Sequence, residues 1–408
     1  MTSIKMLSIN IAIFVISLCV LLVGLEIGLT FLQINTKSNT RYIPNKGSTH
    51  VPGAYFRISK EGFSEGYFNS HGFRDRERSY EKPANTYRIL VLGDSQVEAV
   101  QVALEDSFTA ILEKALNAES CKTKFEVLSF GLSGFGTAEE YERYMNFGID
   151  YSPDMVILAV TTANDIQDNS KFLSWEMTRV YFNFDAKGNL VLDRSLVDAY
   201  DSGLTLPKRF FQALKRHSYL ASLVSERWFL LKQLLSRARF EETHSSLENA
   251  PGTKKLSEFS ELNIYLPDMS LRWREAYEIT KALILKLKSA VEKNGSKFVL
   301  VTLTNAEQVH PEQGEEFSKQ YGLKFDYDQP NRILGELAKQ EFITTLQLMP
   351  SFRKYHVETG QYLHGFGSGT IGHWNERGHR LAAKEILKFL TEKRLTPVDS
   401  CASTNAGT

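Results

Sequence analysis

The stretch RILVLGDSQVEAVQV, residues 88–102, joins an apolar run to a segment that looks like the first turn of a helix. The apolar run contains β-branched residues and is typical of a buried strand. Gly-Asp-Ser follows it directly, so that Ser95 stands where the strand gives way to the helix. Asp and Ser commonly cap helices at such a place. A serine at the carboxyl end of a central strand is also well placed to act as a nucleophile, and the rest of the chain has to decide between these two interpretations.

Apolar runs and amphipathic segments alternate on both sides of this stretch. Helices are predicted at Ser107–Asn117, near Leu271–Lys293, near Pro330–Gln340 and from Glu376 to about Glu392, with further strands at Lys124–Gly131, Asp154–Val160, Lys297–Leu303 and Ile343–Leu348. Strands that alternate with helices and are apolar along their whole length favour a parallel sheet with both faces covered. The sequence therefore predicts an α/β fold.

The composition gives no support for nucleic-acid binding or for a metal site. The 408 residues carry a formal net charge of zero, so no overall field attracts nucleic acid, and no nucleic-acid partner is expected. The three cysteines, Cys19, Cys121 and Cys401, form no CxxC or Cys/His pattern, so no metal site is predicted. Cys121 and Cys401 could pair in an oxidising compartment, but two isolated cysteines are weak support, and we expect both to be free thiols.

The N-terminal segment differs from the remainder. Met6–Leu25 contains twenty residues without a charge, enough to cross a bilayer as a helix. No Ala-x-Ala cleavage site follows, so residues 1–35 are interpreted as a retained membrane anchor and its flank, with a cleaved signal as the alternative. The basic residues that follow the span, Lys37, Arg41 and Lys46, taken alone argue against export of the large domain, but this rule is weak for long domains.

The remaining boundaries follow from composition. Residues 36–68 are predicted to be a linker and lead-in, 69–395 the globular domain, and 396–408 a disordered tail. The domain is expected to carry a helical insertion at about 170–270 without a strand pair comparable to those of the sheet. Within it, Lys208–Phe240 is basic and amphipathic, which is compatible with a membrane surface, an anionic ligand or a helix pair packed on the domain.

The predicted strand ends bring four functional groups to one rim, because parallel α/β sheets bind ligands at the carboxyl ends of their strands. They deliver Ser95, Gly134, Asn164 and, before the last helix, His373. Ser95 can attack a carbonyl if His373 accepts its proton. The backbone N–H groups of Ser95 and Gly134 and the amide of Asn164 would form an oxyanion hole.

Four blocks that carry these residues, VLGDSQ, LSFGLSGFGT, TTANDI and HWNERGH, resemble those of the SGNH (GDSL-type) hydrolases over about residues 69–170 and 297–393. The resemblance implies a flavodoxin-like three-layer α/β/α sandwich and a cofactor-independent esterase, lipase, carbohydrate acetyl-esterase or O-acyl transfer activity. The pattern HWN..GH is similar to that of family branches that act on cell-surface polysaccharides. This similarity favours an extracytoplasmic catalytic domain.

The sequence departs from this family at two positions. Thr162 replaces the usual Gly of the third block, and Thr370 stands where the family has an Asp three residues before the His. Without that Asp, either a Ser95–His373 dyad operates, with a backbone carbonyl or the Thr370 hydroxyl orienting the ring, or a carboxylate arrives from elsewhere. Glu376 is near His373 in the sequence, but it begins a helix, where the helix dipole already favours an acidic residue. It is therefore not expected to orient the ring. Loss of activity is a third interpretation.

The sequence thus predicts a membrane-anchored serine hydrolase that cleaves an ester-linked acyl group from a carbohydrate or other small ester through an acyl-Ser95 intermediate. One alternative is an O-acyltransferase acting on cell-surface polysaccharide. Another is a catalytically silent protein that binds carbohydrate or assists its assembly. His379 is expected to have a local packing role, and Trp374 to line a pocket or anchor the core.

Overall fold

The computed structural model describes residues 2–32, 39–43, 46–59, 61–174, 176, 178–228, 231–232, 254–367 and 369–397. The chain divides into two compact units. The smaller unit comprises Met1–Thr40, Tyr55–Arg57 and Ser202–Glu248, and the larger comprises Arg41–Ala54, Ile58–Asp201 and Asn249–Thr408. The predicted tail at 396–408 and the second half of Lys208–Phe240 lie largely outside the described residues.

A five-stranded sheet in the order β11-β10-β7-β5-β6 forms the centre of the larger unit. Its strands are β5 (Thr86–Gly93), β6 (Lys124–Gly131), β7 (Met155–Thr161), β10 (Lys297–Leu303) and β11 (Thr345–Gln347). All neighbouring pairs are parallel. This is the flavodoxin-like strand order, in which the chain reverses its direction of winding between β5 and β7. The predicted fold class is confirmed.

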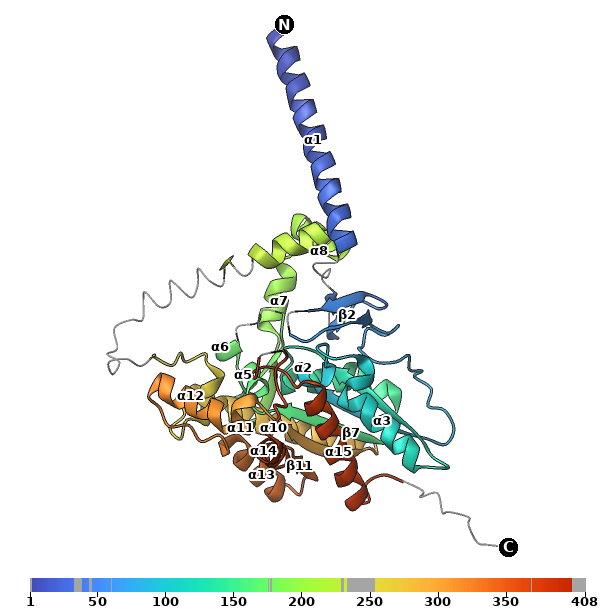
Figure 1. The fold of residues 1–408 in the computed structure, drawn as a ribbon, viewed down its shortest axis with the longest axis vertical. Helices are drawn as coiled ribbons and strands as arrows, with labels where there is room; N and C mark the ends of the chain where they lie inside the picture. The colour runs from blue at the N-terminus through green and yellow to red at the C-terminus, as the bar shows by residue number, and fades with distance from the viewer. Residues whose placement is uncertain are drawn as a thin grey trace. The chain divides into compact units, whose positions relative to one another are not determined.

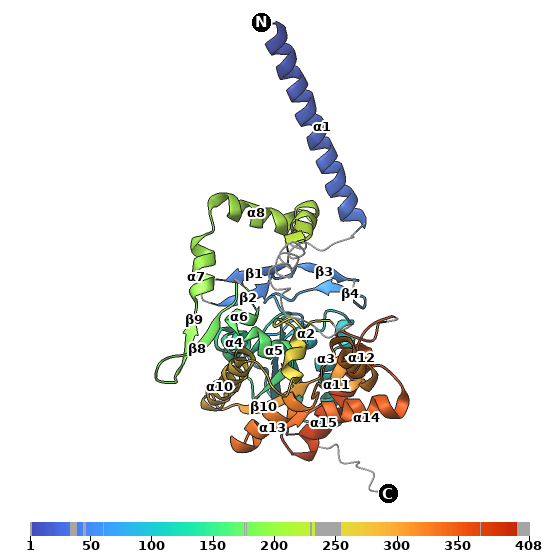
Figure 2. The ribbon, with the colours of Figure 1, turned by 90° about the vertical axis from the view of Figure 1, so that its left-hand side faces the viewer.

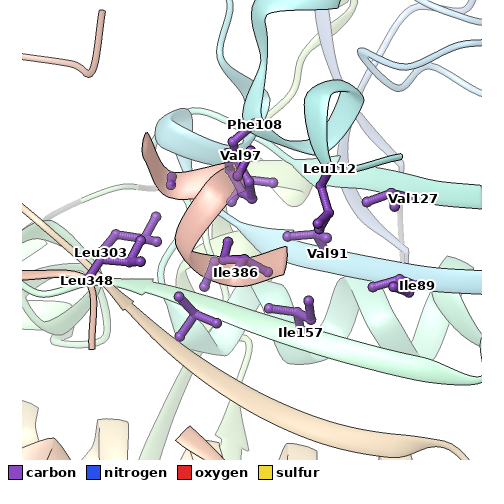
Figure 3. Close-up of a cluster of buried hydrophobic side chains, with 14 of the residues drawn as sticks. Ile89, Val91, Val97, Phe108, Leu112, Val127, Ile157, Leu303, Leu348 and Ile386 are labelled. Carbon is purple, nitrogen blue, oxygen red and sulfur yellow. The ribbon is translucent and has the colours of Figure 1, made fainter. Parts of the chain in front are cut away.

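Alternate residues of each strand feed two separate cores, because successive side chains point to opposite faces of a sheet. On one face, Ile89 and Val91 of β5 pack in a cluster with α3 (Phe108–Glu119) and α15 (Glu376–Glu392) (Figure 3). On the other face, Leu90 and Leu92 pack with α10 (Leu271–Lys293) and α13 (Gln329–Gln340). Figure 2 shows α10 on one side of β10 and α15 on the other. The unit is therefore a three-layer sandwich.

The main helices and strands lie within a few residues of their predicted bounds. The further helices of the larger unit are α2 (Ser95–Glu98), α4 (Thr137–Arg143), α5 (Asn164–Asp168), α6 (Lys171–Ser174), α7 (Ser195–Ser202), α11 (Ala306–Val309), α12 (Pro311–Tyr321) and α14 (Met349–Thr359), with short 3-10 turns at Leu104–Asp106, Ile149–Tyr151 and Glu261–Tyr265 and a π turn at Tyr144–Gly148 (Figure 1). Of these, α11, α12 and α14 have no counterpart among the predicted helices.

Two regions contain short strands that the sequence analysis did not predict. The predicted linker and lead-in contains four short strands, β1 (Thr40–Ile43), β2 (Gly47–His50), β3 (Tyr55–Ile58) and β4 (Ser64–Tyr67). The insertion contains an antiparallel strand pair, β8 (Tyr181–Phe184) with β9 (Leu190–Asp193). Strands of four residues give too short an alternation of polar and apolar positions to stand out in a sequence.

The smaller unit contains two helices whose bounds are described in full. One is α1 (Thr2–Leu32), of which Met6–Leu32 is long and apolar enough to cross a membrane. The other is α8 (Leu206–His217), in which no side chain is buried.

The cysteines differ from expectation in one respect. Cys121 is disulfide-bonded, whereas the sequence led us to expect a free thiol. Cys401 lies outside the described residues, and Cys19, in α1, is free. Two cysteines far apart in a sequence give no indication of their separation in space, so pairing is decided by the fold.

Candidate active site

Ser95 begins α2, directly after β5 and Asp94. The carboxylate of Asp94 accepts a hydrogen bond from the Gln96 N–H at 2.9 Å, so Asp94, and not Ser95, caps this helix. The strand end and the cap together fix the backbone of Ser95, while its side chain stays half-buried at the rim of the sheet. The capping role is therefore filled by a neighbour, which leaves the Ser95 hydroxyl for another use.

His373 lies in the loop that precedes α15. Asn375 caps that helix, because its side-chain oxygen accepts hydrogen bonds from the N–H groups of Arg377 and Gly378. The helix therefore starts at Glu376 and leaves His373 outside it, as predicted. The structure brings His373 Nε2 to 2.8 Å from Ser95 Oγ.

The second nitrogen of the ring contacts a residue that the sequence analysis did not single out. His373 Nδ1 lies 2.7 Å from Glu61 Oε2, and the His373 backbone N–H donates to Glu61 Oε1 at 2.6 Å. Glu61 lies between β3 and β4, in the segment interpreted from sequence as a lead-in. Two bonds to one carboxylate fix both the position of the histidine backbone and the orientation of its ring.

Thr370 does not orient the ring. Within the described part of the chain, the ring nitrogens of His373 bond to Glu61 and Ser95, and the Thr370 carbonyl accepts a hydrogen bond from Gln313 Nε2 at 2.6 Å. The expectation of a dyad completed by the Thr370 hydroxyl or a backbone carbonyl is therefore corrected. A carboxylate is present, and it comes from a different part of the sequence.

The charges of protonated His373 and ionised Glu61 stabilise each other. Burial disfavours protonated His373, but its hydrogen bond to Glu61 and the negative charge of that group outweigh this effect and raise the pKa of His373. Burial likewise disfavours ionised Glu61, but its hydrogen bonds with His373 and the charge of that ring lower the pKa of Glu61. Since ionised Glu61 can only accept, Nδ1 carries the proton and Nε2 of the neutral ring faces Ser95 as an acceptor.

The predicted oxyanion donors are the backbone N–H groups of Ser95 and Gly134 and the side-chain amide of Asn164. The Nδ2 of Asn164 donates to Asp94 Oδ2 at 2.7 Å, and Ser95 Oγ lies 3.5 Å from the same oxygen, so both side chains meet at Asp94. The second N–H of the Asn164 amide remains for a ligand. The backbone N–H groups of Ser95 and Gly134 have no hydrogen-bond acceptor among the described residues. Gly134 is exposed at the same rim, since its loop leaves β6, the neighbour of β5.

Glu98 holds the loop that carries Gly134. Its carboxylate accepts hydrogen bonds from the N–H of Ser133, at 2.7 Å, and from the Ser133 hydroxyl, and it lies 2.5 Å from His50 Nε2. Burial raises the pKa of Glu98, but the His50 charge and these hydrogen bonds outweigh it and hold the pKa at about 2. Arg179 binds the carbonyl of Gly134 from the other side. Sequence reasoning missed the supporting side chains of Glu98, His50 and Arg179, because none of these three residues belongs to the four blocks.

The other residues considered from sequence lie in the core. His379 is buried against Phe108, whose N–H donates to its Nδ1 at 3.4 Å, and burial lowers the pKa of His379 to about 3. Trp374 is fully buried and donates to the Thr304 hydroxyl at 3.0 Å. Thr162 is buried, and its hydroxyl bonds to Gln308. Among the described residues, no group of three or more His, Cys, Asp or Glu is arranged to hold a metal ion.

No known family's sequence model matches this chain, and no curated protein matches it. Similar solved structures include the acetyl xylan esterase AlAXEase, with 13% identity over 74% of this chain and 98% of that one, at a TM-score of 0.38. Another is a mutant of Axe2, an acetylxylan esterase from Geobacillus stearothermophilus, with 14% identity over 74% and 94% and a TM-score of 0.39. TesA matches with 13% identity over 75% and 98% at 0.35. Likeness of this degree carries no inference about substrate.

Proposed function

We propose that this protein is a serine hydrolase of the SGNH type that cleaves ester-linked acyl groups through an acyl-Ser95 intermediate. The observation that carries the proposal is the continuous chain of contacts from Ser95 Oγ to His373 Nε2 and from His373 Nδ1 to Glu61. A nucleophile, a base within hydrogen-bond reach and a carboxylate that orients the base are the parts that acyl transfer requires.

In the first half-reaction, Ser95 Oγ attacks the ester carbonyl carbon while His373 Nε2 takes the serine proton. Glu61 stabilises the imidazolium that forms and stays ionised. The carbonyl oxygen becomes an oxyanion that accepts hydrogen bonds from the backbone N–H groups of Ser95 and Gly134 and from the Asn164 amide. Each such donor contributes about 10²–10³ in rate. The intermediate collapses as the carbon–oxygen bond to the leaving alcohol breaks, and that alcohol receives the proton from His373.

In the second half-reaction, a water molecule takes the place of the alcohol. His373 accepts its proton, the hydroxide adds to the acyl carbon, and the ester bond to Ser95 Oγ breaks with return of the proton to the serine. A sugar hydroxyl in place of water would make the same site an O-acyltransferase. The two activities use one set of residues and differ in the acceptor.

A carbohydrate ester is the substrate class that we favour. The HWNERGH block, residues 373–379, resembles branches of the family that act on cell-surface polysaccharides, and the apolar span Met6–Leu32 would hold the enzyme at a membrane. The Glu61 contact counts against the silent binding protein, because that alternative was motivated by the lack of a carboxylate beside His373.

The proposal is tested with a fluorophosphonate probe and a short-chain aryl ester. The full-length wild type should be labelled at Ser95 and should release the alcohol with a burst. Ser95→Ala should lose both labelling and turnover, while its melting temperature stays close to that of the wild type. Ser120→Ala, at the C-terminal end of α3, is the matched control and should behave as the wild type. Turnover by Ser95→Ala at the wild-type rate would contradict the proposal.

A further inference from the structure

The helix α8 has two chemically distinct faces. Leu206, Phe210 and Leu214 recur every four residues and therefore line one face. The opposite face carries basic residues, among them Lys208, Lys215 and Arg216, and the helix contains no acidic residue. An amphipathic helix with aromatic residues on one face and lysine and arginine on the other is typical of segments that lie in the membrane interface.

The apolar face of α8 is open to solvent. Leu206 is 82% exposed and Phe210 70% exposed, values far above those of apolar side chains that pack on a protein core. The helical segment that follows α8 continues the surface, with Val224 55% and Trp228 59% exposed. An apolar surface of this kind on one small unit indicates a partner.

A set of hydrogen bonds connects this surface to the end of the apolar span. Glu26 follows the uncharged stretch Met6–Leu25, and its carboxylate accepts hydrogen bonds from the Ser218 hydroxyl at 2.7 Å and from the N–H groups of Tyr219 and Leu220 at 2.7 and 3.0 Å. These groups come directly after α8. About 20 apolar residues span the hydrocarbon layer. If the uncharged part of the span, Met6–Leu25, fills that layer, Glu26 lies at the level where the headgroups begin.

The orientation of α8 relative to α1 is also compatible with a position at the membrane surface. Both views of the structure show α8 running across the direction of α1, within the same compact unit. If α1 crosses a bilayer, α8 then lies along its surface. Basic side chains that flank an apolar face match the negative charge of anionic lipid headgroups, which attract such residues near the surface.

We infer that α8 is an interfacial helix that docks on the surface of a bilayer containing anionic lipid, with Leu206, Phe210 and Leu214 at the boundary of the acyl chains. The inference rests on the proposed membrane span and adds a second point of attachment to it. Two attachments restrict rotation of the chain about α1, and so hold it against the membrane surface.

The experiment measures depth at three positions of the full chain, with one chain in each lipid nanodisc. A nitroxide is placed on native Cys19, on Phe210→Cys or on Arg216→Cys, the last two in a Cys19→Ser background. Cys121 is disulfide-bonded and stays unlabelled. Accessibility to oxygen, which concentrates in lipid, is compared with accessibility to a water-soluble nickel chelate. Arg216 is the matched control, since it is exposed and lies about 120° around the same helix from Phe210.

The label at 210 should be more accessible to oxygen than to nickel, and the label at 216 should show the reverse. High nickel accessibility at both positions would show α8 in water, and low accessibility to both reagents at 210 would show it packed on protein; either result overturns the inference. The label on Cys19 tests the span separately. Oxygen access at Cys19 without oxygen access at 210 would contradict the interfacial helix and leave the span intact.

The lipid composition tests the charge of the partner. In discs of phosphatidylglycerol, the ratio of oxygen to nickel accessibility at 210 should exceed the ratio in discs of phosphatidylcholine. Replacing Lys215 and Arg216 by Gln should reduce this difference. Equal ratios in the two lipids would contradict the role of anionic headgroups.

Discussion

Glu61 is the residue that changes the interpretation of the site. A histidine held only by neutral groups would have no negative charge beside it to stabilise its protonated form. The contact of 2.7 Å between Glu61 and His373 supplies that charge and fixes the tautomer, from a position 312 residues away in the sequence. Neither Thr162 nor Thr370, the two departures from the family pattern, contacts the ring of His373 among the described residues.

We expect Glu61→Gln to lower kcat steeply with little change in KM. The amide keeps the size of the carboxylate but can present an N–H to His373 Nδ1, which favours the wrong tautomer and removes the charge. Loss of a triad carboxylate by such a change costs about 10⁴ in rate. Steady-state kinetics on an aryl ester provide the measurement. Thr370→Val is the matched control and should stay near the wild-type rate, so a comparable loss there would contradict the assignment.

The pH dependence of kcat/KM is the second prediction that concerns single residues. His373 acts as a base only when neutral, and Glu61 raises the pKa of His373 above its ordinary value of about 6.5. The value of kcat/KM should therefore rise with pH, with its midpoint above 6.5. In Glu61→Gln, burial without the carboxylate lowers this pKa, and the midpoint of the residual activity should move to lower pH. A midpoint that stays the same in both proteins would argue against the Glu61 contact.

At the scale of elements, three separate segments have to meet for the site to form. The β5–α2 junction holds Ser95, the loop before α15 holds His373, and the turn between β3 and β4 holds Glu61. The last two approach so closely that Gly372 lies against the carboxylate: a Cβ at this position would sit 2.0 Å from Glu61 Oε1, and the residue has a φ of +108°. The glycine allows the contact to form.

Gly372→Ala should therefore separate Glu61 from His373 and lower kcat by a factor approaching that of Glu61→Gln. Strain at its positive φ should also cost about 1–2 kcal/mol of unfolding free energy. Gly360→Ala is a control for strain alone, because Gly360 has a φ of +67° at the end of α14 and no atom within 4 Å of the added Cβ. It should melt at a lower temperature with unchanged kcat. Equal kcat in the two variants would contradict the steric argument.

At the scale of the whole molecule, the apolar span and the disulfide both bear on location. Disulfides persist in oxidising compartments and are rare in the cytoplasm. The bonded state of Cys121 therefore supports the expectation from sequence that the large domain is extracytoplasmic. The basic residues that follow the span argue the other way, but orientation by such charges is weak for long translocated domains.

Thiol trapping in the cells that make the protein tests this orientation. After acid quenching and denaturation, Cys121 should react with a maleimide only when a reductant has been added first. Mass spectrometry of the peptide that contains Cys121 identifies the signal, since Cys19 and Cys401 lie in other peptides. Reaction of Cys121 without reductant would show a free thiol and would contradict an oxidising compartment.

The sequence alone predicted the three-layer sandwich and the pairing of Ser95 with His373. Apolar runs such as Ile89–Leu92 identify strands, because a buried parallel strand needs apolar side chains on both faces. The Asn375 cap located the start of α15 and so placed His373 in the loop. Ser95 and His373 lie at the ends of elements whose order fixes where they meet, and local patterns were therefore sufficient to place them together.

The contact of Glu61 with His373 could be recognised only from the tertiary structure. Glu61 lies in a turn between two four-residue strands, where neither periodicity nor a motif marks it, and its contact with His373 forms across 312 residues. The exposure of α8 was also invisible from sequence, because an amphipathic pattern predicts an apolar face without saying what covers it. Local patterns follow from the regular geometry of single elements, whereas the partner of a side chain depends on how distant segments pack.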